Sequence, residues 1–426
     1  MSERIKEITE KEFQAEVLEK ENVVVDFYST ECPPCEALAR KYENTAELFG
    51  KDVNFIKIFR QGNRALAEKL EVNSSPTVLF YKNGVLQKDR FTGAIKQSQL
   101  EQGLVNLVGT ERGAQLLSNR EEKSTQTDVI VLGGGPAGLT AGIYLSQAKL
   151  RAIIIDPALP GGYVATTHEV SNYPGFAAPQ QGFMLSHYMS EQAKNAGCEF
   201  RAAAELVQVD LEGKKVVLAD GETIIAKFII IASGSSPKIL GVPGEVEYRG
   251  QGISYCATCD AKYYQDKEVV VIGGGNSAVE ESLFIAKFAK KITLVHQFAA
   301  LTANREAQEK LSALPNIEFL FEHEPRQFVK NNGSMDVEVE NLKSGKRSFL
   351  KPNGVFVFAG FQPNTELFHG LLEVDQWGYI KTGEDMKTNI EGIYAAGDIR
   401  SKRYRQITTA VADATIAAIE ITNQCS

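Results

Sequence analysis

The stretch Asp128-Val129-Ile130-Val131-Leu132-Gly133-Gly134-Gly135-Pro136-Ala137-Gly138 decides the fold of this chain. Its apolar run is typical of a buried strand, passes directly into a G-x-G-x-x-G turn, and is followed by a predicted helix over 139–148. The next predicted strand, 152–155, ends in Asp156. Strand, glycine turn, helix, strand and terminal acid form the fingerprint of a dinucleotide-binding unit: the turn admits a pyrophosphate to the helix N-terminus, and the acid binds a ribose hydroxyl.

A second, less complete unit of this kind follows later in the chain. A predicted strand over 268–272 leads into another glycine-rich turn and a helix that extends to about residue 289. The strand after it, 292–295, is followed by His296 where the first unit has an acid. The turn either cradles a pyrophosphate or serves close helix–strand packing. Its candidate cofactor-binding residues are Gly273, Gly275, Asn276, Ser277 and Ala278.

Two Cys-x-x-Cys pairs stand out among the six cysteines. One is Cys256-Ala257-Thr258-Cys259-Asp260, between the two glycine turns, and the other is Cys32-Pro33-Pro34-Cys35 near the N-terminus. Such pairs indicate redox or metal chemistry. Zinc knuckles are normally about 15 to 20 residues apart, whereas more than two hundred residues separate these pairs. Because the five histidines also show no ligand spacing, we assign no metal.

Composition limits the function classes. A chain of 426 residues with 43% hydrophobic and 23% charged residues is ordinary for a globular protein of several domains. A formal net charge of -8 disfavours a nucleic-acid partner, because phosphate binding depends on clustered Lys and Arg. We find no signal-peptide pattern at the N-terminus and no apolar run long enough for a membrane span. The expected location is cytoplasmic.

The N-terminal segment, over roughly residues 5–107, resembles thioredoxin. It has a predicted strand over 23–28 that contains Asp26, a cysteine pair at the start of a predicted helix, and Pro76 opening another strand before an Asn83-Gly84 turn. A helix N-terminus favours a thiolate over a thiol, which lowers the pKa of the exposed cysteine.

That resemblance implies a role for each of four residues. Cys32 is the attacking thiol, Cys35 resolves the mixed disulfide, and Asp26 relays a proton to the second cysteine. Pro76 takes the place of a cis-proline packed against the dithiol. Two departures from the family pattern, Glu31 before the pair and Pro33-Pro34 within it, are expected to alter redox potential and partner choice. Alternatively, Asp26 is a strand-end carboxylate with no catalytic role.

The rest of the chain, about residues 128–422, resembles the low-molecular-weight thioredoxin reductases, in which a nicotinamide-nucleotide domain bearing the redox dithiol is inserted into an FAD domain. The matching motifs are Gly161-Gly162, Glu169 to Gly175, Ala232 to Pro237, Cys256 to Asp260, Gly273 to Glu281, Gly360 with Pro363-Asn364-Thr365, Ala395 to Asp398 and Tyr404-Arg405-Gln406. By this resemblance FAD is held by Gly133, Gly135, Pro136, Ala137, Gly138, Asp156, Gly161, Gly162, Asn172, Asp398, Arg405 and Gln406.

The same resemblance assigns the dithiol. Cys259 is the sulfur that faces the flavin, Cys256 exchanges with the thioredoxin disulfide, and Asp260 is the acid that protonates the outgoing species. The alternative for Asp260 is a surface turn residue.

The electron donor is the open question. Family members that use NADPH have arginines just after the position of His296, whereas this chain has Gln297 and Phe298 there. Losing charge-assisted bonds to the 2′-phosphate disfavours strict NADPH use. We therefore expect NADH or unselective NAD(P)H use at a weak site, with a redox protein such as reduced ferredoxin as the alternative donor.

The predicted fold class is α/β, a thioredoxin fold followed by two three-layer Rossmann-like domains, the second inserted in the first. The predicted boundaries are 1–107 thioredoxin-like, 108–127 a mobile linker, 128–238 FAD-binding, 239–362 NAD(P)-binding-like with the dithiol, and 363–426 FAD-binding again.

The predicted function is a flavin-dependent thioredoxin-disulfide reductase that passes electrons from Cys256-Cys259 to Cys32-Cys35 and on to protein disulfides, as an expected homodimer. One alternative is a flavoprotein that reduces a peroxiredoxin, although that class carries two N-terminal thioredoxin folds and only one fits in 1–107. Another is a sensing or binding module that holds FAD without turnover, and the intact Cys256 and Cys259 argue against it.

Overall fold

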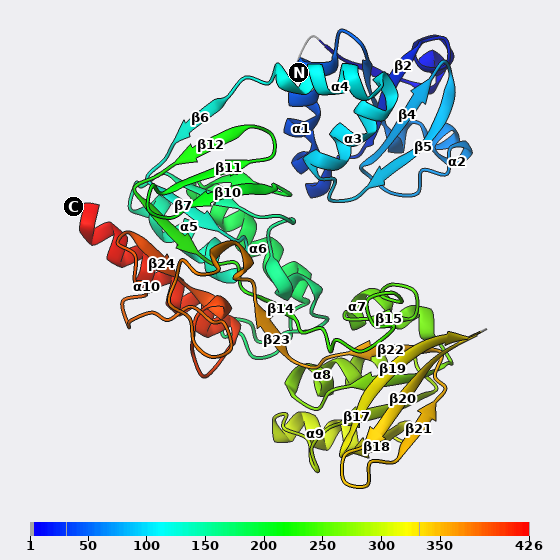
Figure 1. Cartoon of the computed structure of the whole chain (residues 1–426), viewed down its shortest axis with the longest axis vertical. Coiled ribbons are helices and arrows are strands. Elements are labelled where there is room, and N and C mark those ends of the chain that lie inside the picture. The colour runs from blue at the N-terminus through cyan, green and yellow to red at the C-terminus, as the bar shows by residue number, and fades with distance from the viewer. Residues whose placement is uncertain (1–3, 31, 332, 426) are drawn as a thin grey trace.

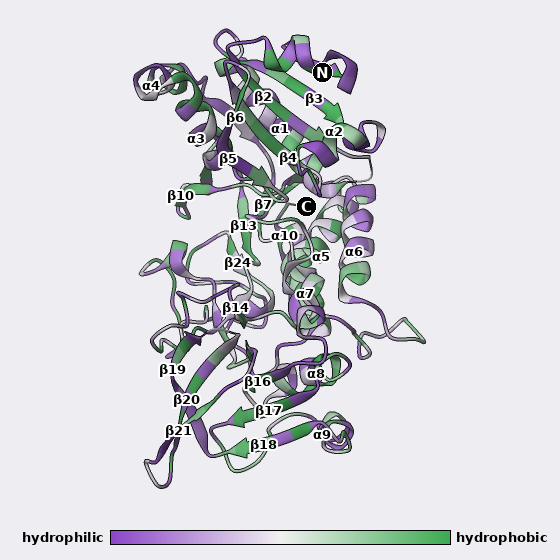
Figure 2. Cartoon of the chain, turned by 90° about the vertical axis from the view of Figure 1, so that its right-hand side faces the viewer, coloured by the Kyte–Doolittle hydropathy of each residue, from purple (hydrophilic) through white to green (hydrophobic). Residues whose placement is uncertain are grey.

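The structure is a computed structural model that describes residues 4–30, 32–331 and 333–425. We name its three parts the N-terminal domain (4–118), the central domain (123–237 and 361–425) and the dithiol domain (238–360). Figures 1 and 2 both show the central domain lying between the other two.

The N-terminal domain is a mixed five-stranded sheet, covered on both faces, with strand order β1-β3-β2-β4-β5. Along β2, Val24 packs into one core while Val23, Val25 and Phe27 pack into the other, as expected for a strand buried on both faces. Hydrophobic residues accordingly colour β2 and β4 green in Figure 2. Its elements are β1 (Ile5–Ile8), β2 (Asn22–Tyr28), β3 (Asn54–Phe59), β4 (Thr77–Lys82), β5 (Val85–Thr92), α1 (Pro33–Phe49), α2 (Arg64–Lys69), α3 (Gln97–Val108), α4 (Thr110–Ser118) and the short turns η1 (Glu10–Glu12), η2 (Gln14–Leu18) and η3 (Arg60–Gly62).

The central domain is built on a parallel sheet of order β24-β13-β7-β8-β9, with a second sheet of order β10-β11-β12-β6. Strand β24 comes after the dithiol domain in the chain yet pairs with β13, so the dithiol domain is an insertion, as predicted. The main sheet holds β7 (Val129–Leu132), β8 (Ala152–Ile155), β9 (Glu199–Arg201), β13 (Phe228–Ile231) and β24 (Ile393–Ala395). The second sheet holds β6 (Lys123–Gln126), β10 (Leu206–Asp210), β11 (Lys215–Leu218) and β12 (Glu222–Ile225). The helices are α5 (Pro136–Gln147), α6 (Gly182–Ala196) and α10 (Ile407–Cys425), with η4 (Gly162–Thr166), η6 (Glu366–Phe368) and η7 (Gly397–Ile399).

The dithiol domain repeats this architecture with a parallel sheet of order β15-β22-β16-β17-β18 and an antiparallel sheet β19-β20-β21. Its elements are β15 (Ile253–Ser254), α7 (Ala257–Asp260), η5 (Ala261–Tyr264), β16 (Glu268–Ile272), α8 (Asn276–Ile285), β17 (Lys291–His296), α9 (Arg305–Ser312), β18 (Ile317–Phe321), β19 (His323–Asn331), β20 (Ser334–Asn341), β21 (Arg347–Leu350) and β22 (Gly354–Val357). The two passages of the chain between this domain and the central domain run as an antiparallel pair, β14 (Ser235–Pro237) with β23 (Phe361–Pro363). The predicted α/β fold class is confirmed.

The structure corrects the prediction of a mobile linker over 108–127. Residues 110–118 form α4, whose Leu116 is buried in the core of the N-terminal domain, and 123–126 form β6, which pairs in parallel with β12. The apolar positions of α4 are few and scattered among polar residues, which is why the polar composition concealed the helix. Only residues 119–122 connect the two domains without regular structure. Within the described residues, no helix is long and apolar enough to cross a membrane.

Candidate redox and nucleotide sites

The first glycine turn joins β7 to α5 and requires glycine. Gly133 has a φ of 114°, and a Cβ atom on Gly138 would lie 1.8 Å from the Gly133 carbonyl oxygen. Asp156, which follows β8, is 8% exposed and accepts hydrogen bonds from the backbone N–H of Gly134 at 2.5 Å and of Ala158 at 2.7 Å. Burial raises the pKa of this carboxyl, and the two N–H donors oppose the rise. The acid therefore lies at the turn, as the dinucleotide fingerprint requires.

A second pair of glycines completes this cradle. Gly161 and Gly162 have φ values of 134° and 59°, and the Gly161 N–H donates to the Gly134 carbonyl at 2.7 Å. A Cβ on Gly135 would meet only the Gly162 Cα, at 3.7 Å. Pro136 starts α5, where its missing N–H costs no helical hydrogen bond. The backbone on both sides is thus free of side chains, so a pyrophosphate can approach closely.

The C-terminal part of the central domain contributes further residues that were predicted to hold FAD. A Cβ on Gly397 would lie 2.9 Å from the Cβ of Ala137, so η7 packs directly on the start of α5. Among the described residues, Asp398 Oδ1 and Arg405 Nε are buried without a hydrogen-bond partner. Buried polar atoms are normally satisfied, so these two indicate a ligand group.

Asn172 and Gln406 meet at this site as well. The Asn172 side-chain amide donates to Gln406 Oε1 at 3.3 Å, although the two residues are far apart in sequence. The residues predicted to hold FAD therefore fit that group: a glycine cradle, a ribose acid, and polar atoms left over for a ligand.

The second glycine turn, between β16 and α8, packs against the end of β17, but a Cβ on Gly275 would meet only Thr302 Oγ1, at 3.8 Å. A Cβ on Gly274 would lie 2.5 Å from the His296 ring, and the Thr302 N–H donates to the Gly274 carbonyl at 2.8 Å. His296 Nε2 is buried without a partner among the described residues, and burial lowers the pKa of the ring. Phe298 is 54% exposed and stacks edge-on against His296, and Asn276 Oδ1 accepts from the Asn304 N–H at 2.7 Å. No cation from the position after β17 takes part in these contacts.

The dithiol Cys256–Cys259 lies at the start of α7 and faces the central domain. The two cysteines form a disulfide, and Cys256 is the N-cap of the helix, its sulfur accepting from the Cys259 N–H at 3.2 Å. Cys256 Sγ lies 3.9 Å from the carbonyl oxygen of Thr166 in η4, whereas Cys259 is exposed and Asp260 half-buried. The ring of His168 stacks on Phe284 of α8 with centroids 3.8 Å apart, which holds the two domains together beside the dithiol.

A buried carboxylate that the sequence did not single out anchors this dithiol. Glu245 is fully buried, accepts the Tyr255 hydroxyl at 2.5 Å, and accepts the N–H groups of Leu240 and Gly241 at 2.9 and 2.7 Å. Because Tyr255 immediately precedes Cys256, Glu245 ties the dithiol to the chain segment that leaves the central domain.

The N-terminal dithiol has the same local design. Cys32 and Cys35 form a disulfide at the start of α1, Cys32 is the N-cap, and its sulfur accepts from the Cys35 N–H at 3.3 Å. The peptide bond before Pro76 is cis, and the Ser75 carbonyl oxygen lies 3.5 Å from Cys32 Sγ. Glu31, which precedes the pair, lies outside the described residues.

Asp26 lies in β2 of the same domain. Its side chain is 1% exposed, Oδ1 has no hydrogen-bond partner among the described residues, and Oδ2 lies 3.9 Å from Lys57 Nζ. Burial raises the pKa of Asp26 to about 7, with Lys57 opposing the rise. A carboxyl that titrates near neutrality suits a proton relay.

The structure does not bring the two dithiols together. Figures 1 and 2 place α1 on the N-terminal domain and α7 on the dithiol domain, with the central domain between these two domains. Transfer between them therefore requires a rearrangement.

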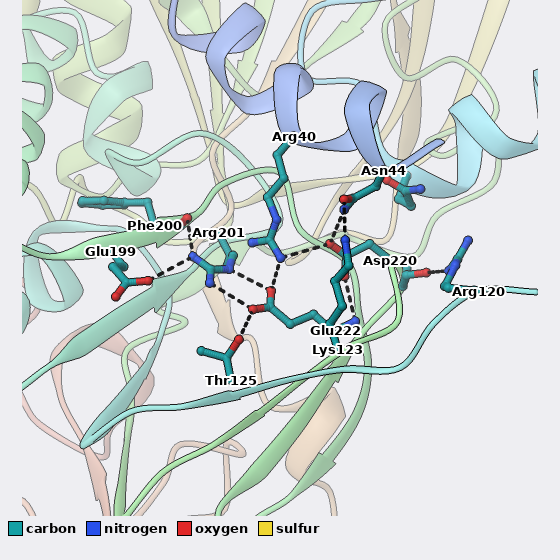
Figure 3. A network of polar contacts seen from close by, with 12 residues as sticks. Arg40, Asn44, Arg120, Lys123, Thr125, Glu199, Phe200, Arg201, Asp220 and Glu222 are labelled. Carbon is teal, nitrogen blue, oxygen red and sulfur yellow. Dashed lines mark hydrogen bonds and ion pairs between the residues drawn. The ribbon is translucent and has the colours of Figure 1, made fainter. Parts of the chain in front are cut away.

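The N-terminal domain is docked on the central domain through a polar network (Figure 3). Glu222, 2% exposed, is paired with Arg40 of α1 at 2.5 Å and with Arg201 of β9 at 2.8 Å, and it accepts the Thr125 hydroxyl at 2.6 Å. Burial alone would raise the pKa of Glu222, but the hydrogen bonds and charges of Arg201, Thr125 and Arg40 lower it to about 2. Arg40 also lies 3.6 Å from Asp220.

Further contacts extend the interface. Lys41, 6% exposed, donates to the carbonyls of Ile95 at 2.9 Å and of Ala203 at 2.6 Å. The carboxylate of Glu205 accepts both the N–H and the hydroxyl of Ser98, at 2.9 and 2.8 Å, in the first turn of α3. A carboxylate at a helix N-terminus is stabilising, because the helix dipole is positive at that end. Sequence reasoning missed all of these residues, because nothing in the local pattern relates residues that are 107 to 182 positions apart.

Comparison with known proteins agrees with this geometry. The family model described as pyridine nucleotide-disulphide oxidoreductase matches residues 127–414, and the thioredoxin model matches residues 4–106. A thioredoxin reductase of Peptoclostridium litorale is 44% identical over 302 residues, which cover 69% of this chain and 95% of that protein. The "34.2 kDa protein in rubredoxin operon" of Clostridium pasteurianum is 41% identical over 301 residues, covering 70% of this chain and 97% of that protein.

Solved structures give the same result. The thioredoxin reductase of Lactococcus lactis in its "FR conformation" superposes with a TM-score of 0.67 at 35% identity and covers 70% of this chain and 98% of that one. The T. acidophilum thioredoxin reductase has a TM-score of 0.66 at 30% identity, with 70% and 99% covered. The chain therefore belongs to the thioredoxin reductase family of FAD-binding pyridine nucleotide-disulphide oxidoreductases, and it carries a thioredoxin domain at its N-terminus.

Proposed function

We propose that this chain is a self-contained disulfide reductase, in which electrons pass from FAD to Cys256–Cys259, then to Cys32–Cys35, and finally to a disulfide of another protein. The observation that carries the proposal is the pair of matched dithiols: each caps a helix N-terminus, and one of them faces a domain with a glycine cradle and unsatisfied buried polar atoms.

FAD, when bound, supplies the electron pair that reduces Cys256–Cys259. The residues of the central domain hold it: the backbone at Gly133–Gly138 and Gly161–Gly162 accommodates the pyrophosphate, and Asp156 binds a ribose hydroxyl. Asp398 Oδ1, which lies 3.5 Å from Lys402 Nζ, and Arg405 Nε both lack a hydrogen-bond partner among the described residues and could bond the cofactor. Asn172 and Gln406 orient each other at the rim of this site.

The transfer between the dithiols is a thiol–disulfide exchange. The Cys256 thiolate attacks Cys32 Sγ, a mixed disulfide forms, and Cys35 leaves as a thiolate that takes up a proton. The Cys259 thiolate then attacks Cys256, which restores the Cys256–Cys259 disulfide and releases Cys32. The N-terminal domain gains two electrons and two protons, and it passes them by the same steps to its target disulfide.

Two carboxyls supply protons in this scheme. Asp26, whose pKa is about 7, exchanges a proton with Cys35, and Asp260 protonates the thiolate that leaves the dithiol domain.

The assignment of Cys256 as the exchanging sulfur can be tested directly. In a chain carrying Cys259→Ser and Cys35→Ser, a mild two-electron oxidant such as diamide should convert the Cys256 and Cys32 thiols into a stable mixed disulfide, detected by mass spectrometry after proteolysis. Trapping by Cys259 in the Cys256→Ser, Cys35→Ser chain instead would reverse the assignment. The contact of Cys256 with Thr166 makes this comparison informative, because it is Cys256 that lies against the central domain here.

For the donor we propose NADH or unselective NAD(P)H rather than strict NADPH. The support is the segment after β17, where Gln297 and the exposed Phe298 offer no cation for a 2′-phosphate. A second donor class, reduced ferredoxin or another redox protein, follows from the same lack of cations after β17.

Anaerobic mixing of the oxidised protein with each donor, followed by flavin bleaching, separates these cases. We expect NADH to bleach the flavin at a concentration equal to or lower than the concentration of NADPH that bleaches it. Rapid bleaching by micromolar NADPH alone would contradict the proposal, and bleaching by reduced ferredoxin but by neither nucleotide would select the second donor class.

The same assay, extended to protein disulfides, decides whether a peroxiredoxin is among the targets. A protein that binds FAD and reduces no disulfide with any donor would be a binding module. The expected homodimer is checked by light scattering.

A further inference from the structure

We propose that helix α1 of the N-terminal domain forms one wall of the pocket for the adenosine half of FAD, so that domain docking and flavin binding stabilise each other. This inference rests on the FAD site proposed above.

A cavity of about 610 Å³ lies between the two domains. Pro33, Pro34, Ala37 and Arg40 of α1 line it on one side, and Leu159, Pro160, Ala202 and Ala204 of the central domain line it on the other. Sites for small organic ligands typically measure about 300–1,000 Å³ and are mostly apolar. The volume and the lining thus suit a flat, largely apolar group such as an adenine ring.

The central-domain wall of this cavity is continuous with the ribose acid. The Ala204 N–H donates to the Asp156 carbonyl at 2.9 Å, and the Ala203 N–H donates to the Ala158 carbonyl at 2.8 Å. Leu159 and Pro160 follow Asp156 directly in the chain. Because the fingerprint places the ribose at this acid, the base attached to that ribose has the cavity beside it.

Two neighbouring residues fix α1 against that wall. Lys41 reaches across to the carbonyl of Ala203, in the segment that is hydrogen-bonded to the 156–158 backbone, and Arg40 pairs with Glu222 on β12. Burial lowers the pKa of Lys41 to about 8, opposed by Glu205 and Asp220. The groove that receives the adenosine and the surface that receives α1 therefore share one piece of backbone.

The consequence is a reciprocal coupling. If docking of α1 raises the affinity for FAD by some factor, then FAD raises the docking equilibrium by the same factor, and such factors typically lie between about 5 and 150.

The test uses the full-length chain, stripped of FAD and titrated with it while flavin fluorescence is followed. Arg40→Glu, which opposes Glu222 and Asp220, should weaken FAD binding by about 10-fold. Ala37→Trp, which fills the cavity without removing an ion pair, should weaken it as well. The matched control is Arg112→Glu, because Arg112 pairs with Asp52 inside the N-terminal domain, far from the cavity lining; it should leave the affinity unchanged.

Proteolysis of the connection at 119–122 reports docking without any enzyme activity. FAD and ADP, which carry the adenosine, should slow cleavage there in the wild-type chain, and FMN, which lacks it, should not. Arg40→Glu should speed cleavage and reduce the protection by FAD.

Equal FAD affinity in wild type, Arg40→Glu and Ala37→Trp would overturn the inference, and so would protection by FMN equal to that by ADP. A wild-type chain that fails to bind FAD at all would instead refute the proposed flavin site, so the two failures are distinguishable.

Discussion

At the scale of single residues, Asp26 links function to pH. Its pKa in the folded chain is about 7, above its ordinary 3.8, so folding favours the protonated form. The stability that this form contributes is fully present below about pH 4 and is lost as the pH rises through 7. We expect the urea midpoint of the N-terminal domain to fall between pH 5 and pH 8, and Asp26→Asn to abolish that fall while stabilising the domain above pH 7 by roughly 4 kcal/mol.

The Asp52→Asn variant is the control for this measurement. A hydrogen bond from Arg112 lowers the pKa of Asp52, so its contribution has the opposite sign and is lost as the pH falls. A urea midpoint of Asp26→Asn that follows the wild-type pH profile would show that Asp26 is already ionised in the folded chain.

Glu222 is the residue on which the interface depends. With a pKa of about 2, it is charged at every pH above about 4 and holds Arg201 as well as Arg40. Glu222→Gln leaves the half-buried Arg201 with Glu199 as its remaining charge partner, and we expect the free energy of unfolding to fall by about 3 kcal/mol. Glu199, whose side chain is 44% exposed, also contacts Arg201. Glu199→Gln should lower the free energy of unfolding by less than about 1 kcal/mol. Equal losses in the two variants would mean that burial of Glu222 contributes nothing.

At the scale of elements, two glycines of the turn between β7 and α5 should affect different properties, one the stability of the fold and the other the affinity for FAD. Gly138→Ala drives a Cβ into the Gly133 carbonyl and should destabilise the chain by about 1–3 kcal/mol. Gly135→Ala meets only Gly162 at an ordinary contact distance, so thermal stability of the FAD-free chain should be kept while FAD affinity falls at least about 10-fold, because the added methyl group blocks the pyrophosphate. Calorimetry and FAD titration of both variants check this, and a Gly135→Ala chain with wild-type affinity would place the pyrophosphate elsewhere.

The proposed donor preference depends on the residues at the end of β17. Installing two arginines, Gln297→Arg with Phe298→Arg, supplies charge-assisted bonds to a 2′-phosphate, each worth about 1.5–3 kcal/mol. The NADPH-to-NADH ratio of flavin reduction rates should rise about 10- to 100-fold. Phe298→Ala is the control and should leave the ratio near its wild-type value. A double-arginine variant with an unchanged ratio would indicate that no nucleotide binds over this turn.

At the scale of the whole molecule, the short connection between α4 and β6 limits the relay. Residues 119–122 can span at most about 14 Å when fully extended, and α1 and α7 lie on different sides of the central domain. Inserting ten Gly and Ser residues after Asn119 should therefore speed reduction of Cys32–Cys35 by Cys256–Cys259 several-fold, measured by thiol trapping after rapid mixing. The same insertion in the exposed turn at Ser344 is the control. An unaltered rate would indicate transfer between two chains of a dimer.

The sequence was informative wherever chemistry is local. Glycine turns, strand-ending Asp156 and both Cys-x-x-Cys pairs can be recognised within a few residues, because backbone geometry itself demands glycine or a helix N-terminus there. The resemblance to known families extended this to the flavin site, where Asn172 and Gln406 do meet. The interface could not be predicted, because Arg40 and Glu222 lie on different domains and form their ion pair only when these domains dock. The same holds for α4, whose polar surface hid its packing on the N-terminal domain.

The covalent connection through β6 also determines how the relay responds to dilution. A separate thioredoxin must find its reductase by collision, so its reduction slows in proportion to its concentration. A tethered domain instead experiences an effective concentration that depends on whether the connecting chain lets the two dithiols meet, and not on the amount of protein. In the proposed relay, reduction of Cys32–Cys35 by Cys256–Cys259 of the same chain is therefore first-order, and its rate does not depend on the protein concentration.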